Sequence, residues 1–278
     1  MAAPAARKTF RVLSFNIWVG GDKISLEKTA EVIRSSEAAL VGLQEVKANG
    51  PRLAEMTGMT LYEQGNSAIL SRYPIQAESP LKMGVKVELP EIGPVWMFNT
   101  HLAASPYQPY QLAGIPYGKE NPDIHTAAEA IGEALRARGQ QVSRLLMDLG
   151  FALQTGAPIV LTGDFNEPSH LDWTANAAQT GKCQLPVPWP TSRAICDAGF
   201  KDAWRSVHSN EVTHPGHTWT PVPGKREIHD RIDFVYSHGL EAINALRIGE
   251  NAENADLVVS PYPSDHRAVL AEFAVPTA

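Results

Sequence analysis

Short apolar runs recur along the chain, and most of them end in a polar residue. The runs are rich in Val, Ile, Leu and Phe and are bounded by Gly, Pro or Asn, a pattern typical of buried β-strands. We therefore predict strands over residues 9–17, 39–43, 67–71, 85–89, 95–100, 159–161, 232–236 and 268–273.

Two longer segments carry apolar residues at helical spacing. Residues 25–36 place Leu26, Ala30 and Ile33 on one side, and residues 126–154 predict a long helix. The apolar stripe of the long helix comprises Ile131, Leu135, Val142, Leu145, Leu146 and Leu149.

The alternation of strand-like and helix-like segments predicts an α/β fold, with two mixed β-sheets packed face to face and helices outside. Residues 186–223, which precede the last predicted strands, are rich in turn-forming residues. No internal repeat, low-complexity tract or Gly/Ser-rich linker divides the chain. We expect one domain over residues 8–275, preceded by an N-terminal extension over residues 1–7.

The composition is that of a folded protein, with 44% hydrophobic and 19% charged residues among 278. The longest uncharged stretch, residues 92–118, contains prolines and polar side chains and does not fit a bilayer span. We therefore expect no transmembrane segment.

The compartment is left open by two features. The first residues lack the apolar region of a signal peptide but are similar to what remains after cleavage at a small-residue site. Secretion or periplasmic export is one expectation, and a cytoplasmic location is the alternative. Cys183 and Cys196 are compatible with one disulfide or with two thiols.

Polar side chains that can bind a metal or move a proton stand at the ends of several predicted strands. They are Asn16, Glu45, His101, Asp164, Asn166, Asp230, Asp233, Asp265 and His266. Each has an ordinary explanation when taken alone: Asn16 suits a turn, Glu45 a helix N-terminus and Asp164 an Asx turn. Because sites form at strand ends in α/β folds, so many coincidences favour one functional site.

Seven segments resemble, in order, the motifs of the endonuclease/exonuclease/phosphatase (DNase-like) superfamily. They are Leu13-Ser14-Phe15-Asn16, Leu43-Gln44-Glu45, residues 66–75 (NSAILSRYPI), Asn99-Thr100-His101-Leu102, Thr162-Gly163-Asp164-Phe165-Asn166, Arg231-Ile232-Asp233-Phe234 and Ser264-Asp265-His266. No single motif is specific, but the ordered set covers about residues 10–273 and is highly specific. The resemblance implies a four-layer α/β sandwich and hydrolysis of a phosphoric ester that depends on Mg²⁺ or Mn²⁺.

The resemblance also implies where the metal would bind. Glu45 would be the main ligand, with Asn16 and Asp265 close to the ion. Oxygen ligands of this kind suit Mg²⁺, which usually keeps several waters. The metal would neutralise charge and lower the pKa of bound water.

The remaining matched residues would carry the chemistry. Asp164 would orient or deprotonate the attacking water, and Asn166 would hold that water or a phosphate oxygen. His101 and His266 would face the scissile phosphate, where imidazolium stabilises developing negative charge. Asp233 would hold His266 in orientation.

The carboxylate that supports His266 has two candidates. Family branches place it in either of two patterns, and this chain has both, as Asp230-Arg231-Ile232-Asp233. Strand alternation puts Asp230 and Asp233 on opposite faces, so only one should reach His266, and we favour Asp233. Asp230 is then a candidate substrate contact.

Two further features are candidates for substrate binding. The loop over residues 105–118 carries Tyr107, Tyr110 and Tyr117 and directly follows His101. It is a candidate wall of the pocket, with Tyr107 as a substrate contact, and packing of the loop on itself is the alternative. His170 is a candidate substrate contact or the start of a helix.

The charge balance bears on the substrate. The chain has 24 Lys+Arg against 30 Asp+Glu, a net charge of −6, and no long basic run. Proteins that grip duplex DNA usually carry a basic face. We therefore favour a phosphodiesterase acting on a small or flexible substrate such as a nucleotide, a sugar phosphate or a lipid head group.

Two alternatives remain. One is a nuclease that cleaves DNA or RNA in a groove assembled from Arg72, Arg193, Arg205, Arg226 and Arg231. The other is a non-catalytic binding scaffold of the same fold. Such a scaffold should have lost a motif residue, and all of them are present.

Overall fold

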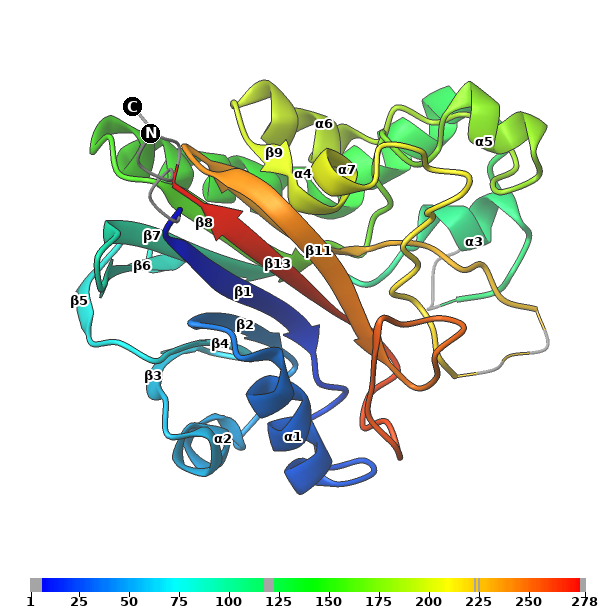
Figure 1. Cartoon of the computed structure of the whole chain (residues 1–278). Coiled ribbons are helices and arrows are strands. Elements are labelled where there is room, and N and C mark those ends of the chain that lie inside the picture. The colour runs from blue at the N-terminus through cyan, green and yellow to red at the C-terminus, as the bar shows by residue number, and fades with distance from the viewer. Residues whose placement is uncertain (1–6, 118–122, 223, 225, 276–278) are drawn as a thin grey trace, which may run out of the picture.

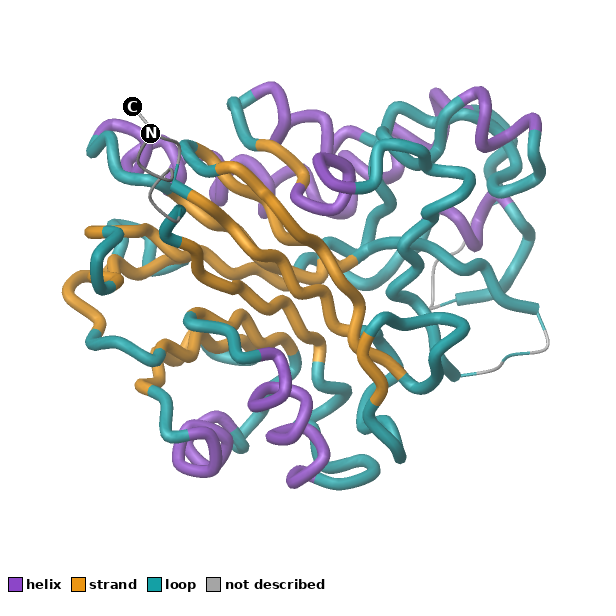
Figure 2. The backbone as a smooth tube through the Cα atoms, in the orientation of Figure 1, coloured by secondary structure: helices purple, strands orange, loops and turns teal. Residues whose placement is uncertain are grey.

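Two mixed β-sheets lie face to face between two layers of helices in the computed structural model of this chain (Figures 1 and 2). The structure describes residues 7–117, 123–222, 224 and 226–275. This four-layer sandwich confirms the predicted fold class. Of the predicted N-terminal extension, only Arg7 lies within the described residues.

The first sheet has seven strands in the order β12-β11-β13-β1-β2-β4-β3. Its central strands β1 and β2 run parallel, and β13 pairs antiparallel with β1. In chain order the strands are β1 (Thr9–Asn16), β2 (Leu40–Gln44), β3 (Thr60–Gln64), β4 (Ser67–Ser71), β11 (Glu241–Gly249), β12 (Leu257–Val258) and β13 (Ala268–Ala274).

The second sheet has six strands in the order β5-β6-β7-β8-β10-β9. Strands β7 and β8 run parallel, and β10 pairs antiparallel with β8. The strands are β5 (Ile75–Glu78), β6 (Gly84–Leu89), β7 (Gly93–His101), β8 (Ile159–Asp164), β9 (Lys201–Asp202) and β10 (Asp233–His238).

The helices α1 and α2 cover the outer face of the first sheet, and α4 and α6 cover the second (Figure 1). Their bounds are α1 (Leu26–Ser36), α2 (Gly50–Thr57), α4 (Ala127–Gln154) and α6 (Pro190–Asp197), with the short helices α3 (Gln108–Leu112), α5 (Ala175–Gln179) and α7 (Ala203–Val207) in the connections. The side chains of Ser25 and Thr126 cap α1 and α4, which explains why these helices begin where the sequence predicts. Within the described ranges, no helix combines the length and apolarity needed to cross a membrane.

Strand alternation builds three separate cores. On β1, Leu13 and Phe15 face the helices α1 and α2, whereas Val12 faces the other sheet. On β8, Val160 faces the first sheet, and Leu161 packs against α4. Both central strands are therefore buried on both faces, which is why they read as continuous apolar runs.

The structure corrects the predicted stripe of α4. Leu135 is 52% exposed, whereas Arg138 and Asp148 are buried. The 105–117 loop supplies partners for Arg138, and the backbone N–H groups of Leu81 and Met83 donate to Asp148. The buried face of the helix is therefore partly charged, because loops from elsewhere in the chain satisfy those charges.

Several elements are absent from the prediction. Strands β3, β5 and β11 are partly exposed, and their mixed polarity hides them. The turn-rich stretch holds α6, β9 and α7. Cys183 and Cys196 are both free thiols in this structure.

Candidate active site

Six strands bring their ends to one edge of the sandwich. Strands β1, β2, β7 and β8 end there, and the antiparallel strands β10 and β13 begin there. The register places Asp164 between His101 on β7 and Asp233 on β10. The topology therefore gathers motifs that are distant in the sequence.

Close approach of the two sheets depends on Gly42 of β2. A Cβ at this position would lie 1.9 Å from Thr162 Oγ1 and 2.5 Å from Asn99 Oδ1. Nearby, the backbone N–H of Gly163 donates to Ser14 Oγ over 3.1 Å. These contacts fix β1 and β2 against β7 and β8 directly below the site.

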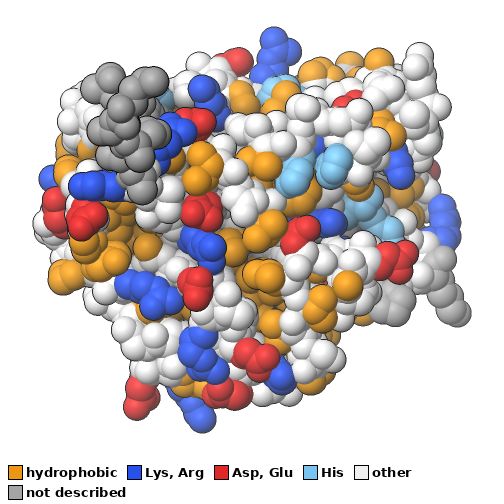
Figure 3. Space-filling model, viewed as in Figure 1, with side chains coloured by type: hydrophobic (Ala, Val, Ile, Leu, Met, Phe, Trp, Pro, Cys, Tyr) orange, Lys and Arg blue, Asp and Glu red, His pale blue; other side chains and the backbone are white. Residues whose placement is uncertain are grey.

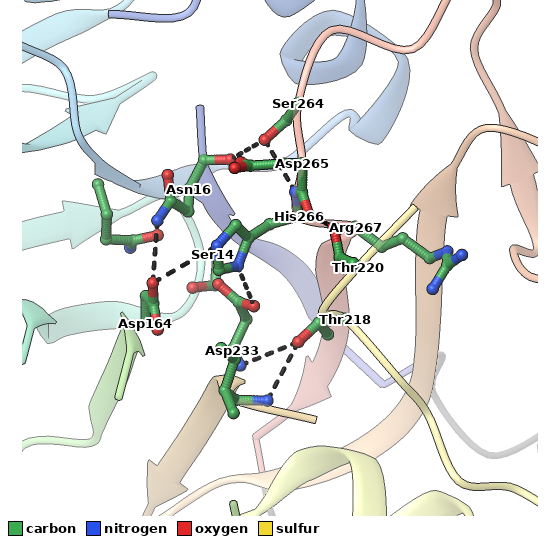
Figure 4. A network of polar contacts seen from close by, with 12 residues as sticks. Ser14, Asn16, Asp164, Thr218, Thr220, Asp233, Ser264, Asp265, His266 and Arg267 are labelled. Atoms are coloured by element: carbon green, nitrogen blue, oxygen red, sulfur yellow. Dashed lines mark hydrogen bonds and ion pairs between the residues drawn. The ribbon is translucent and has the colours of Figure 1, made fainter. Parts of the chain in front are cut away.

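Asp164 lies at the centre of the site and is 1% exposed. Its Oδ2 accepts a hydrogen bond from Asn16 Nδ2 at 2.9 Å (Figure 4). Its Oδ1 accepts the backbone N–H of Asn166 at 2.9 Å. The second contact is the expected Asx turn. The Nε2 atoms of His101 and His266 lie 3.5 and 3.8 Å from Asp164 Oδ2. One buried carboxylate thus faces both histidines.

His266 forms a buried pair with Asp233, whose Oδ2 lies 2.9 Å from His266 Nδ1 (Figure 4). Burial alone would lower the pKa of His266, but the carboxylates of Asp233 and Asp164 outweigh it and raise that pKa to about 10. Thr218 Oγ1 accepts the backbone N–H of Asp233 at 3.1 Å and so fixes the start of β10. His266 is therefore an imidazolium at neutral pH, and Asp233 is its partner, as favoured above.

Asp230 precedes β10 by three residues and is not among the residues that line the pocket at this site. Its two carboxyl oxygens accept hydrogen bonds from Tyr107 Oη at 2.6 Å and from Trp173 Nε1 at 2.8 Å. Burial raises its pKa to about 6. Because both oxygens are engaged away from the pocket, the structure corrects the expectation that Asp230 contacts substrate.

Glu45 and Asp265 contribute two carboxylates to the pocket. Glu45 has a positive φ of 64° directly after β2, and its Oε2 accepts the backbone N–H of Val19 at 2.7 Å. Burial raises the pKa of Asp265 to about 6, and the neighbouring carboxylates Glu45 and Asp164 act in the same direction. Two carboxylates that repel each other in a half-buried pocket favour a bound cation.

The amide of Asn16 presents its nitrogen, and not its oxygen, to the neighbouring carboxylates. Its Nδ2 points to Asp164 and lies 3.4 Å from Glu45 Oε1, and its Oδ1 accepts the backbone N–H of Trp18. Asn16 therefore holds two site carboxylates in place, and its expected position beside the ion stays a prediction.

The predicted residues surround a pocket of about 100 Å³. It is lined by Glu45, His101, Ala104, Tyr107, Tyr110, Tyr117, Asp164, Asn166, Trp219, Ile232, Asp265 and His266. The expected tyrosine wall is present. Asn166, with φ 48°, is held there by a hydrogen bond from its Nδ2 to the carbonyl of Leu102.

Trp219 is a site residue that the sequence analysis missed. Its ring lies 4.9 Å from the His266 ring, and its backbone pairs with both Asp230 and His266 as isolated bridges. The only signal in the sequence was a large aromatic residue within a turn-rich stretch.

His170 lies outside the pocket. Its Nδ1 is 2.9 Å from Ser192 Oγ, in the N-terminal turn of α6. The contact anchors a connection on the helical side of the second sheet, so the structure does not support His170 as a substrate residue.

Two arginines of the alternative nuclease groove are not available at the surface. Arg205 and Arg231 are buried, and both pair with Asp172. Arg193 pairs with Asp197 on α6. Acidic and basic side chains are interspersed over the face seen in Figure 3. Two of the five arginines are therefore structural.

Comparison of the sequence with known proteins identifies a matching family and a relative of this chain. Residues 13–266 match the model of the Endonuclease/Exonuclease/phosphatase family. An uncharacterised protein of Caenorhabditis elegans, F14F9.5, is 30% identical over 95% of this chain and 90% of its own length.

Two solved structures share the fold. An endonuclease/exonuclease/phosphatase from Beutenbergia cavernae has a TM-score of 0.60 at 19% identity, over 98% of this chain and 73% of its own. An AP endonuclease from Archaeoglobus fulgidus has a TM-score of 0.59 at 15% identity, over 94% of this chain and 98% of its own. At these identities the likeness shows the fold alone.

Proposed function

Because this chain belongs to the Endonuclease/Exonuclease/phosphatase family, whose members are metal-dependent phosphoesterases or nucleases, we propose that it is a divalent-metal-dependent phosphodiesterase acting on a small or flexible substrate. The observation that carries this proposal is the buried Asp164 flanked by two histidines, at 3.5 and 3.8 Å, at the floor of an acidic pocket. A non-catalytic scaffold would have no need to hold these groups together.

The metal would bind between Glu45 and Asp265. Asp164, Asp233 and His266 also lie close together, with potential ligand atoms within 4.8 Å of one another. His266 is protonated, however, with its pKa raised to about 10, and imidazolium has no lone pair for a metal. The oxygen pair Glu45 and Asp265 fits Mg²⁺ or Mn²⁺ better. When bound there, the metal neutralises phosphate charge and lowers the pKa of a coordinated water.

The protein groups would carry the proton and the developing charge. Asp164 takes the proton of the attacking water as the new P–O bond forms opposite the leaving oxygen. The P–O bond to the alcohol then breaks, and the alcohol leaves with a proton from solvent. His266 Nε2 is 3.8 Å from Asp164, too far for a hydrogen bond, so its N–H is available to a phosphate oxygen.

The two spaces that share His101 favour a diester over a monoester as the substrate. The aromatic pocket is on one side, and a second groove of about 620 Å³, which shares His101, is on the other. This second groove, which we call the polar groove, is lined by amides such as Gln64 and Gln141 and by charges of both signs, with Tyr62 and Met83 as apolar parts. The charged residues are Glu63, Glu78, Lys82 and Arg144. A diester has two substituents to accommodate and a monoester has one.

A nuclease is the second candidate. The polar groove can take a flexible nucleic-acid strand, and the fold is shared with an AP endonuclease. The interspersed charges on the face seen in Figure 3 and the burial of Arg205 and Arg231 disfavour binding of duplex DNA there.

Hydrolysis of bis-p-nitrophenyl phosphate and of p-nitrophenyl phosphate tests the proposal, each with Mg²⁺, Mn²⁺ or EDTA. We expect metal-dependent hydrolysis with preference for the diester, and its loss in Asp164→Asn. The exposed Asp197→Asn is the matched control. Preference for the monoester, or an active Asp164→Asn, would overturn the proposal, and nicking of plasmid DNA at physiological salt would favour the nuclease.

A further inference from the structure

Three tyrosines form a preformed wall on one side of the pocket, which we call the aromatic corner (Tyr107, Tyr110 and Tyr117). The rings of Tyr107 and Tyr110 are 4.9 Å apart at 89°, and those of Tyr110 and Tyr117 are 5.4 Å apart at 84°. Each neighbouring pair of rings is thus perpendicular. Buried Arg138 anchors the loop by donating to the carbonyl of Pro106 at 3.0 Å.

Two of the three hydroxyl groups are engaged by carboxylates outside the pocket lining. Tyr107 donates to Asp230 at 2.6 Å, and Tyr110 donates to Glu227. Trp219 Nε1 also donates to Glu227, at 3.1 Å, which fixes this carboxylate behind the wall. Tyr107 and Tyr110 line the pocket but are only 4% and 6% exposed, so Tyr117, at 37%, offers most of the open ring surface of the aromatic corner. A hydroxyl that donates to an anion leaves its ring richer in electrons.

The carboxylates next to the aromatic corner favour a positive charge against its rings. The pocket lining itself contains three carboxylates and the imidazolium of His266, and within the described residues it contains no Lys or Arg. Asp230 and Glu227 add negative charge behind the aromatic corner. Aromatic faces with carboxylates nearby attract ammonium groups, and quaternary ammonium most of all.

A flat base fits this wall less well. Bases are bound by stacking on parallel ring faces, whereas each neighbouring pair of rings in the aromatic corner is perpendicular. A compact, roughly spherical cation can contact several perpendicular rings at once.

We propose that the aromatic corner is a cation subsite, and that the substrate is a phosphodiester with an ammonium group, such as a choline ester, on one of its alcohols. This proposal rests on the proposed function and specifies its substrate class.

The test compares two esters of the same shape. p-Nitrophenyl phosphorylcholine carries the trimethylammonium group, and p-nitrophenyl 3,3-dimethylbutyl phosphate replaces its nitrogen with carbon. We expect kcat/KM to be about 5- to 30-fold higher for the choline ester, the scale of a partly desolvated cation–π contact. Equal rates, or preference for the dimethylbutyl ester, would overturn the cation subsite.

Hydrolysis of bis-p-nitrophenyl phosphate, which carries no cation, separates failure of the cation subsite from failure of the proposed function. If it is hydrolysed without choline preference, the cation subsite alone fails. If none of the three esters is hydrolysed, the proposed function fails. The subsite is then judged by binding, because choline but not 3,3-dimethylbutan-1-ol should show line broadening in NMR spectra with the protein. Equal behaviour of the two alcohols would overturn it.

Amino-acid substitutions test which residues produce the preference for the choline ester. Tyr117→Leu should lower the ratio of the two rates toward one. Glu227→Gln should lower it two- to fivefold, because it removes the charge but can still accept from Tyr110 and Trp219. Tyr73→Leu, on the connection between β4 and β5, should leave the ratio unchanged. An unchanged ratio in both Tyr117→Leu and Glu227→Gln would place the preference elsewhere and overturn the assignment.

The choline ester can be soluble or part of a membrane. Hydrolysis of glycerophosphocholine supports a soluble source, and hydrolysis of sphingomyelin vesicles supports a lipid source of the same group. Faster hydrolysis of a dinucleotide than of both would overturn the cation subsite.

Discussion

Asp230 lowers stability at neutral pH, so Asp230→Asn should stabilise the protein. Burial raises its pKa from 3.8 to about 6, which means that the folded state binds this proton more tightly than the unfolded chain does. The stability linked to this proton is therefore fully present below pH 3.8 and is lost as pH rises through 6. The loss at pH 8 is about 3 kcal/mol, since one pKa unit corresponds to roughly 1.4 kcal/mol.

Asparagine removes the charge and can keep both partners. Its Oδ1 can accept from Trp173 Nε1, and its Nδ2 can donate to Tyr107 Oη, which has a free lone pair. We expect the variant to gain about 3 kcal/mol in free energy of unfolding at pH 8, and about half of that at pH 5, where Asp230 is mostly protonated. The exposed Asp197→Asn should change stability by less than about 0.5 kcal/mol at either pH.

Urea denaturation at pH 5 and pH 8 measures this effect. A gain of this size raises the midpoint by about 1 M urea at pH 8. A variant that is less stable than wild type at pH 8, or one whose gain is the same at both pH values, would refute the reasoning. Because Asp230 does not line the pocket, its replacement should also leave hydrolysis of bis-p-nitrophenyl phosphate within a few-fold of wild type.

Three further predictions follow from the site and the sheet interface. Asp233→Asn and His266→Ala should each lower kcat by about 10²–10⁴ with melting still cooperative, measured on the diester with Mg²⁺, and near-normal turnover would contradict their roles. Glu45→Gln should raise the metal concentration needed for half-maximal rate and be partly rescued by high Mn²⁺, whereas an unchanged metal dependence would exclude Glu45 as a ligand. Gly42→Ala should destabilise the protein by about 3 kcal/mol or more in urea denaturation, since its Cβ would lie 1.9 Å from Thr162 Oγ1, and wild-type stability would contradict the close packing.

The central strands and the site residues are the parts of the molecule that the sequence predicts well. Buried parallel strands such as β1 and β8 read as apolar runs, and a polar residue at the end of such a run is conspicuous. Asp164 and Glu45 are identified in this way. Strand alternation also separates Asp233 from Asp230, because residues three apart point to opposite faces.

Long-range pairing explains what the sequence does not reveal. Arg138 and Asp148 look like exposed helix positions until the loops that satisfy them are in place. Trp219 lies in an irregular segment, and only the fold brings it to within 4.9 Å of His266. Asn16 matches its motif, but its orientation depends on a hydrogen bond from the Trp18 backbone.

The function we propose would let one pocket select a diester through groups at its centre. Phosphate charge would be met there, by His266 and by a metal at Glu45 and Asp265, so the walls would need no further positive charge. The walls would then be free to recognise the two alcohols, one against electron-rich rings and one in the polar groove. A substrate with a phosphate at every step, such as duplex DNA, would bring negative charge against Glu227 and Asp230. If the cation subsite is correct, the acidic surroundings of the aromatic corner would thus select against polyanions and for a zwitterionic ester through the same carboxylates.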